Sequence, residues 1–131
     1  RCKEELVDGF IFCTRTLGFV NAPALMQHVV RSLQGLTVDI SDYQRKRDYL
    51  YGRLTDLGYS VVKPQGAFYL FPKSPLADDV AFVDALQSWN VLTVPGRGFG
   101  TPGHFRISYC VEDWVLAGAV EGFARAADKF L

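Results

Sequence analysis

Apolar and polar positions repeat along the chain with two different periods, and these periods predict a mixed α and β fold. Apolar residues three and four positions apart share one face of a helix, and this spacing recurs in five segments. Their apolar positions are Leu6, Val7, Phe10 and Ile11; Leu25, Val29, Val30 and Leu33; Tyr43, Leu50, Leu54 and Leu57; Val80, Phe82, Val83 and Leu86; and Leu116, Val120, Phe123 and Ala127. Short apolar runs between turn residues predict four strands, at 60–63, 67–71, 91–94 and 105–111.

The order of these elements is three helices, two strands, one helix, two strands and a last helix. Such an order indicates an α/β or α+β protein, with helices packed on a small mixed or antiparallel sheet of about four strands. The run 67–71 is apolar at successive positions, so we expect this strand to be buried on both faces. No repeat or linker interrupts the chain, and we expect residues 1–131 to form one domain.

Short polar side chains indicate where the helices begin. Ser41, followed three residues later by Gln44, fits a capping box, in which each side chain bonds a backbone N–H at the helix start. Asp78 or Asp79 is expected to cap the fourth helix. The first helix is expected to end before an irregular segment at 15–21.

Composition and charge exclude several classes of protein and of partner for this chain. Hydrophobic residues make up 49% of the chain and charged residues 21%, which is enough apolar surface to form a core and excludes intrinsic disorder. The 14 Lys and Arg residues balance 14 Asp and Glu residues, so we expect no nucleic acid as a partner. No apolar run approaches the roughly 20 residues that a membrane-spanning helix needs, so we expect no membrane partner.

The cysteines and histidines do not form a recognisable metal site. The three cysteines are odd in number and lack C-x-x-C spacing, which argues against a disulfide framework and against zinc. His104 and Cys110 supply at most two ligands, whereas a structural zinc site needs four. We therefore expect no metal, and the free cysteines indicate a reducing compartment, the cytoplasm.

A glycine-rich segment at 95–104 invites comparison with phosphate-binding loops. Thr101 stands where a dinucleotide fingerprint needs its third glycine, and His104-Phe105 stand where a P-loop needs lysine and a hydroxyl residue. Both motifs also require a helix where a strand is expected. The remaining interpretation is a loop whose glycines adopt positive φ and allow close approach to a neighbour.

Arg106 is the polar residue of greatest interest. Alternation along its strand places it, with Ser108 and Cys110, on the face opposite to the strand's apolar residues. An arginine in the middle of a strand needs a partner for its charge, because burying a charge alone is costly. Two interpretations stay open: an ion pair within the protein, or an anion held bidentately by the planar guanidinium.

Four segments resemble the C-terminal part of class I/II, fold-type I aminotransferases that use pyridoxal phosphate (PLP), the aspartate aminotransferase family. The segments are Phe19–Pro23, Lys63–Tyr69, Val94–Gly100 and Phe105–Ser108, and the resemblance covers essentially all 131 residues. It implies that the chain is the small C-terminal domain of such an enzyme. The N-terminal helical segment at 1–34 would then join the large domain.

The resemblance also implies roles for single residues. Arg106 would bind the α-carboxylate of the amino acid or 2-oxo acid substrate, and Gly66 and Gly96 would border the substrate side of the cleft. Asn21 would lie near the partner subunit's site in a homodimer.

The family's cofactor lysine lies N-terminal to the part that this chain resembles. The chain has five lysines, and none stands in the sequence context of that lysine; they are Lys3, Lys46, Lys63, Lys73 and Lys129. The chain also begins at Arg1, and its only methionine is Met26, so we expect a piece of a longer protein. We therefore expect the isolated chain to bind no PLP and to be inactive.

Two alternatives share the scaffold and stay open. A PLP-dependent C–S lyase, or a related decarboxylating enzyme, would use the same arginine and cofactor. A binding module that keeps the fold without catalysis would use the arginine alone.

Overall fold

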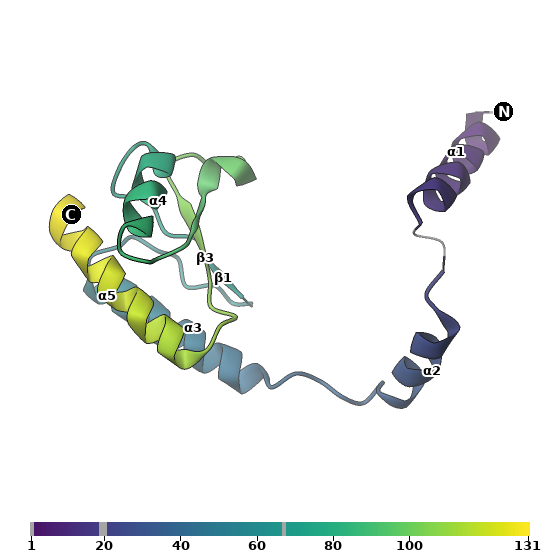
Figure 1. Cartoon of the computed structure of the whole chain (residues 1–131), viewed down its shortest axis with the longest axis horizontal. Coiled ribbons are helices and arrows are strands. Elements are labelled where there is room, and N and C mark those ends of the chain that lie inside the picture. Colours follow the sequence, from purple (N-terminus) through teal and green to yellow (C-terminus); the bar gives the residue numbers. More distant parts are fainter. Residues whose placement is uncertain (1, 19–20, 67) are drawn as a thin grey trace. The chain divides into compact units, whose positions relative to one another are not determined.

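The structure, a computed structural model, describes residues 2–18, 21–66 and 68–131. The chain divides into two compact units, Arg1–Val38 and Asp39–Leu131, and each is described by itself. Figure 1 labels the helices of both units. No helix in the described part of the chain has the length and apolar character needed to cross a membrane.

The first unit contains two helices, α1 (Cys2–Leu17) and α2 (Ala24–Ser32). The expected end of the first helix before residue 15 is wrong, because α1 continues for three more residues. The hydroxyls of Thr14 and Thr16 donate to backbone carbonyls four residues earlier, at 2.8 and 2.9 Å. These bonds keep both side chains within the helix, and Gly18 follows its end with a φ of 81°. Residues 19–20 of the expected irregular segment lie outside the described residues.

The second unit contains three helices, a short 3₁₀ turn and a small sheet. In chain order its elements are α3 (Ile40–Asp56), β1 (Tyr69–Leu70), α4 (Asp79–Gln87), β2 (Val94–Pro95), η1 (Gly96–Phe99), β3 (Phe105–Ser108) and α5 (Asp113–Phe130). The strand order is β1-β3-β2, and both pairs are antiparallel.

The expected fold class is confirmed, but the sheet in the described residues has three strands where about four were expected. Residues 60–63 form no strand. The backbone N–H of Lys73 donates to the carbonyl of Ser60 at 2.8 Å, and no ladder continues from this bond. The strands expected at 67–71 and 105–111 are shorter in the structure, at Tyr69–Leu70 and Phe105–Ser108. The strand expected at 91–94 is shifted to Val94–Pro95, the residues that pair with β3.

Acidic side chains cap the two helices that begin near the sheet. The expected capping box at Ser41 is wrong, because Asp39 is the N-cap of α3. Its carboxylate accepts hydrogen bonds from the Ser41 backbone N–H at 2.9 Å and from the Ser41 hydroxyl at 2.6 Å. A carboxylate is the stronger acceptor at a helix N-terminus, so the serine donates to it. At α4 the cap is Asp78, one of the two expected residues.

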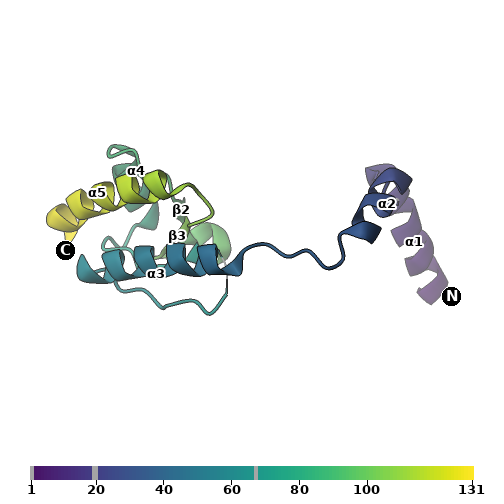
Figure 2. The ribbon, with the colours of Figure 1, turned by 90° about the horizontal axis from the view of Figure 1, so that it is seen from below.

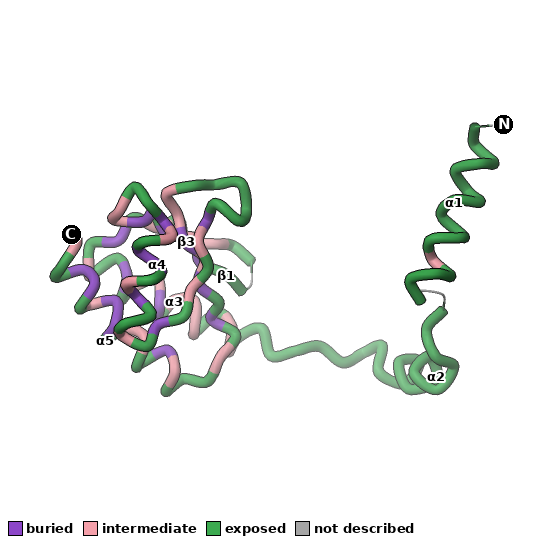
Figure 3. The backbone as a smooth tube through the Cα atoms, turned by 45° about the horizontal axis from the view of Figure 1, so that its top comes forward, coloured by how far each residue is buried: buried purple, intermediate pink, exposed green. Residues whose placement is uncertain are grey.

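The helices of the second unit pack on one face of the sheet, and α3 and α5 lie side by side (Figure 2). The ring centroid of Phe105 on β3 lies 5.0 Å from that of Phe82 on α4 and 6.2 Å from that of Phe123 on α5. The predicted alternation along β3 is confirmed, since Phe105 and Ile107 are buried and Ser108 is exposed. Figure 3 shows the buried positions along these elements.

The opposite face of the sheet is open among the described residues. The expectation that the strand at 67–71 is buried on both faces is wrong, because only Leu70 is fully buried. Phe68 and Tyr69 are 39% and 40% exposed. Ala67 lies outside the described residues. The open face therefore carries aromatic side chains beside Arg106.

The first unit exposes an apolar surface along α1. Leu6, Phe10 and Phe12 are each more than half exposed, and no residue described in α1 or α2 is buried. Exposed apolar patches of this kind favour association with another surface.

We expect the 131-residue chain to self-associate through this surface at high concentration. Replacing Phe10 and Phe12 by serine removes two large exposed rings and should shift the chain towards monomer. Sedimentation velocity of both proteins checks this. A wild-type chain that stays a single monomeric species would contradict the expectation.

Candidate functional site

Arg106 lies in the middle strand of the sheet, on its open face. In the antiparallel register Arg106 stands opposite Val94 of β2, and Ser108 stands opposite Tyr69 of β1. Residues directly opposite each other share a face of an antiparallel pair. These four side chains therefore occupy one face, away from the helices and the core.

Two aromatic rings flank the guanidinium of Arg106. Its Cζ lies 4.3 Å from the ring centroid of Tyr69 and 4.2 Å from that of Phe99. Both distances are well within the roughly 6 Å over which a cation interacts with an aromatic face. A guanidinium stacked on rings keeps its N–H donors in its own plane, where a planar anion can reach them.

Of the two interpretations of Arg106, the internal ion pair has no partner among the described residues. The described residues form no hydrogen bond or ion pair with its guanidinium, whose contacts are the two rings. The geometry therefore favours a site for an external anion.

Arg97, nine residues earlier, is bound in the opposite way. Its backbone N–H donates to Oδ2 of Asp79 at 2.7 Å, and its Nε donates to Oδ1 of the same carboxylate at 2.8 Å. A terminal guanidinium nitrogen donates to Oδ1 of Asp78 at 2.7 Å. Arg97 is thus neutralised by two carboxylates from the start of α4.

Asp79 is completely buried and has a shifted pKa. Burial alone would raise the pKa of its carboxyl, but the hydrogen bonds from the backbone and side chain of Arg97 hold that pKa below its usual range. Sequence reasoning missed this ion pair. The available signal was an acidic pair at a helix start and an arginine between glycines.

The glycine-rich segment begins with a 3₁₀ turn and continues as a tight loop, where a loop throughout was expected. Gly96 is buried, and its N–H donates to the carbonyl of His104 at 2.7 Å. A Cβ at this position would collide with the carbonyl oxygen of Thr101 and lie 2.7 Å from that of His104. The expected positive φ is confirmed at Gly100 and Gly103, at 75° and 76°.

The η1 turn places the ring of Phe99 against the guanidinium of Arg106. Further aromatic side chains contact the Phe99 ring in turn. The ring of Phe71 meets Phe99 edge-to-face at 6.3 Å and stacks on His104 at 5.5 Å. Arg106 and the turn that begins at Gly96 are therefore brought together through Phe99.

The other two expected site residues have different surroundings. The carbonyl of Gly66 accepts a hydrogen bond from the hydroxyl of Tyr109 at 2.9 Å, which ties the turn before β1 to the end of β3. Burial raises the pKa of that Tyr109 hydroxyl. Asn21 belongs to the first compact unit, where it is exposed and precedes α2.

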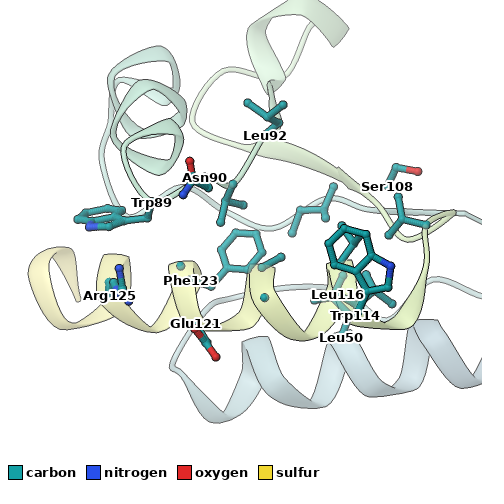
Figure 4. Close-up of a pocket in the computed structure, with 17 residues that line it drawn as sticks. Leu50, Trp89, Asn90, Leu92, Ser108, Trp114, Leu116, Glu121, Phe123 and Arg125 are labelled. Carbon is teal, nitrogen blue, oxygen red and sulfur yellow. The ribbon is translucent and has the colours of Figure 1, made fainter.

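A pocket of about 580 Å³ lies elsewhere in the second unit, between α5 and the segment that enters β2 (Figure 4). Apolar side chains such as Trp89, Trp114 and Phe123 line most of it, and Arg106 is not among the lining residues. Its ionisable lining residues are Glu121 and Arg125 on α5, and neither belongs to the strand and glycine-rich turn that surround Arg106, where we place the candidate site.

Gly96→Ala should destabilise the fold, because the added methyl group collides with backbone oxygens that cannot move independently. We expect the free energy of unfolding to fall by about 2 kcal/mol. Gly98→Ala is the matched control, since nothing lies within 4 Å of a Cβ there, and it should change stability by less than about 0.5 kcal/mol. Urea unfolding measures both. Equal stability of the two variants would contradict the close approach.

Asp79→Asn should make the free energy of unfolding depend less on pH in the acid range. Because the folded-state pKa of Asp79 is lowered, its contribution is complete above its unfolded pKa of about 4 and is lost as the pH falls through the folded value. Urea unfolding from about pH 6 to about pH 3 should therefore show a steeper loss for the wild type than for the variant. Asp84→Asn, an exposed change on the same helix, is the control and should follow the wild type. Parallel profiles for Asp79→Asn and the wild type would contradict this.

Comparison with known proteins identifies the family. Residues 4–123 match the family model of class I and II aminotransferases. An aspartate/prephenate aminotransferase from Thermus thermophilus is 45% identical over 89 residues, which cover 66% of this chain and 23% of that protein. An aspartate aminotransferase from Bacillus subtilis is 38% identical over 96 residues, covering 66% of this chain and 24% of that protein.

Solved structures agree with these relatives. The crystal structure of an amino transferase from Eubacterium rectale superposes with a TM-score of 0.82 at 42% identity, covering 89% of this chain and 29% of that one. Aspartate aminotransferase from Thermus thermophilus with maleate gives a TM-score of 0.62 at 40% identity, covering 64% and 22%. The chain thus spans about a quarter of the length of the curated relatives it matches. The resemblance expected from the four motifs is confirmed, and the chain belongs to the class I and II aminotransferase family.

Proposed function

We propose that this chain is the part of a PLP-dependent aminotransferase that binds the substrate α-carboxylate, and that Arg106 makes that contact. The observation that carries the proposal is the guanidinium of Arg106, flanked by two rings and without a carboxylate partner among the described residues. It is supported by membership in a family of enzymes that transfer amino groups.

The guanidinium suits a carboxylate better than other anions of similar size. Its parallel N–H donors match the two oxygens of a planar carboxylate, and such bidentate pairs fix orientation as well as adding affinity. In this role Arg106 binds the substrate and orients its α-carbon. Orientation of this kind can supply a large part of a rate enhancement.

PLP is the cofactor that the family implies for the full-length enzyme. Three lysines of the second unit, Lys46, Lys63 and Lys129, have contacts that do not fit a covalent link to it. Lys46 and Lys63 form ion pairs with Asp42 and Asp48, each at 2.9 Å, and the Nζ of Lys129 lies over the rings of aromatic neighbours. We infer that the link to PLP belongs to another part of a longer protein, and that the isolated chain is inactive.

The remaining assignments belong to the same proposal. The helical segment at 1–34 joins the large domain, which is supported by the division into compact units at Val38. Asn21 approaches the partner subunit's site in a homodimer, and Gly66 and Gly96 border the substrate side of the cleft. The enzyme is cytoplasmic.

Arg106→Lys in the aminotransferase that contains this chain should raise the KM for the amino acid and lower kcat/KM by at least about a hundredfold. A lysine keeps the positive charge but cannot copy the planar donors. Arg45→Lys is the control, because Arg45 is exposed and pairs with Asp42 and Asp113. Steady-state kinetics measure both variants.

The products separate the alternatives in the same assay. A 2-oxo acid formed by amino-group transfer supports the proposal, whereas pyruvate, ammonia and a thiol indicate a C–S lyase. Unchanged kinetics for Arg106→Lys would contradict the assignment of Arg106.

A further inference from the structure

We propose that Phe99 and Tyr69 are positioning residues for Arg106, and that the ion pair of Arg97 with the buried Asp79 carboxylate holds Phe99 in place. This inference rests on the proposed function of Arg106 and goes beyond it, because it assigns four residues that do not themselves bind the carboxylate. It follows from which contacts the Arg106 side chain makes and which it lacks.

The orientation of the Arg106 side chain depends on the contacts of its guanidinium. A long arginine side chain loses considerable rotamer freedom when it is held in one geometry. Among the described residues no hydrogen bond or ion pair restrains its guanidinium, and the contacts that remain are the rings of Tyr69 and Phe99, at 4.3 and 4.2 Å. The two rings therefore set the plane in which its donors face a ligand.

Tyr69 is held in place directly by the sheet. Tyr69 pairs with Ser108, two residues beyond Arg106 on the same face of β3. Its ring also lies 4.8 Å from the ring of Phe68, and that ring lies 6.4 Å from Tyr43 on α3. Backbone pairing and this aromatic row keep the Tyr69 ring beside the guanidinium.

Phe99 lies on a turn of only four residues and is 45% exposed. The start of the turn is held by the Gly96 N–H, which donates to the carbonyl of His104 at 2.7 Å, and the position of the rest of the turn depends on a further anchor. Arg97, two residues earlier, provides that anchor through its backbone and side-chain bonds to the buried carboxylate of Asp79. The anchor fixes the turn to the start of α4, and Phe71 supports the ring of Phe99 edge-to-face.

Arg97 and Arg106 differ in the charge of their neighbours. Arg97 has its charge neutralised by Asp78 and Asp79, so it does not compete with Arg106 for an anionic ligand. Arg106 is held by uncharged rings, so its own charge stays available. The ion pair of Arg97 with the buried carboxylate of Asp79 thus acts on the ligand site through Phe99, without touching the ligand.

Kinetics of the aminotransferase that contains this chain test the inference. Phe99→Leu and Tyr69→Leu keep apolar bulk but remove the rings, and each should raise the KM for the amino acid about three- to tenfold while changing kcat less than about twofold. Phe99→Tyr and Tyr69→Phe keep the rings and should restore the wild-type KM. Arg97→Lys, which keeps the charge but loses the fork, should raise KM in the same direction.

A control variant removes an aromatic partner from a different arginine. The guanidinium of Arg53 lies 5.7 Å from the ring centroid of Tyr49 on α3, outside the candidate site. Tyr49→Leu should therefore leave KM and kcat unchanged. A general loss of stability would affect this variant as well.

A spectroscopic measurement on the 131-residue chain tests the geometry without cofactor or substrate. Protons over aromatic faces resonate upfield, so the Nε–H signal of Arg106 should lie upfield of an ordinary arginine. Phe99→Leu should move it downfield, Arg97→Lys should move it part of the way, and Tyr49→Leu should leave it in place.

The outcomes separate this inference from the proposed function. If Arg106→Lys lowers kcat/KM but the ring variants keep the wild-type KM, the positioning inference is wrong and the carboxylate contact stands. An Arg106 signal that does not respond to Phe99→Leu also overturns the inference. If Arg106→Lys itself has no effect, the proposed function is wrong.

Discussion

The site depends on the packing of β3 against the helices. Phe105 and Ile107 are buried against the core, and the ring of Phe105 meets Phe82 and Phe123 from two different helices. Because successive side chains of a strand point to opposite faces, burying these two residues forces Arg106 onto the open face. A slip of one residue would exchange the two faces, so the hydrophobic core sets the direction of Arg106.

The sequence was sufficient where a pattern is local and repeated. The alternation at 105–108 placed Arg106 correctly, and the acidic pair before α4 contained its true cap, Asp78. The sequence was insufficient where two neighbouring residues could both cap the same helix. Asp39 and Ser41 both suit an N-cap, and the carboxylate accepts from the serine because it is the stronger acceptor.

The remaining features depend on contacts between residues far apart in the sequence. The apolar run at 67–71 predicted a strand buried on both faces, yet Tyr69 is 40% exposed, because its ring lies beside Arg106 on the open face of the sheet. The ion pair of Arg97 with Asp79 joins residues 18 positions apart. Local pattern shows which residues are charged or aromatic, whereas the register of the sheet and the path of the η1 turn decide which of them meet.

The choice of aromatic rather than acidic neighbours for Arg106 has a physical reason. A carboxylate beside a guanidinium neutralises its charge and occupies its donors, as Asp78 and Asp79 do for Arg97. An aromatic ring interacts with the face of the guanidinium and leaves the donors in its plane for a ligand. Arg97 and Arg106 are nine residues apart and chemically identical, so their neighbours alone decide that carboxylates occupy the donors of Arg97, whereas the guanidinium of Arg106 lies between two rings.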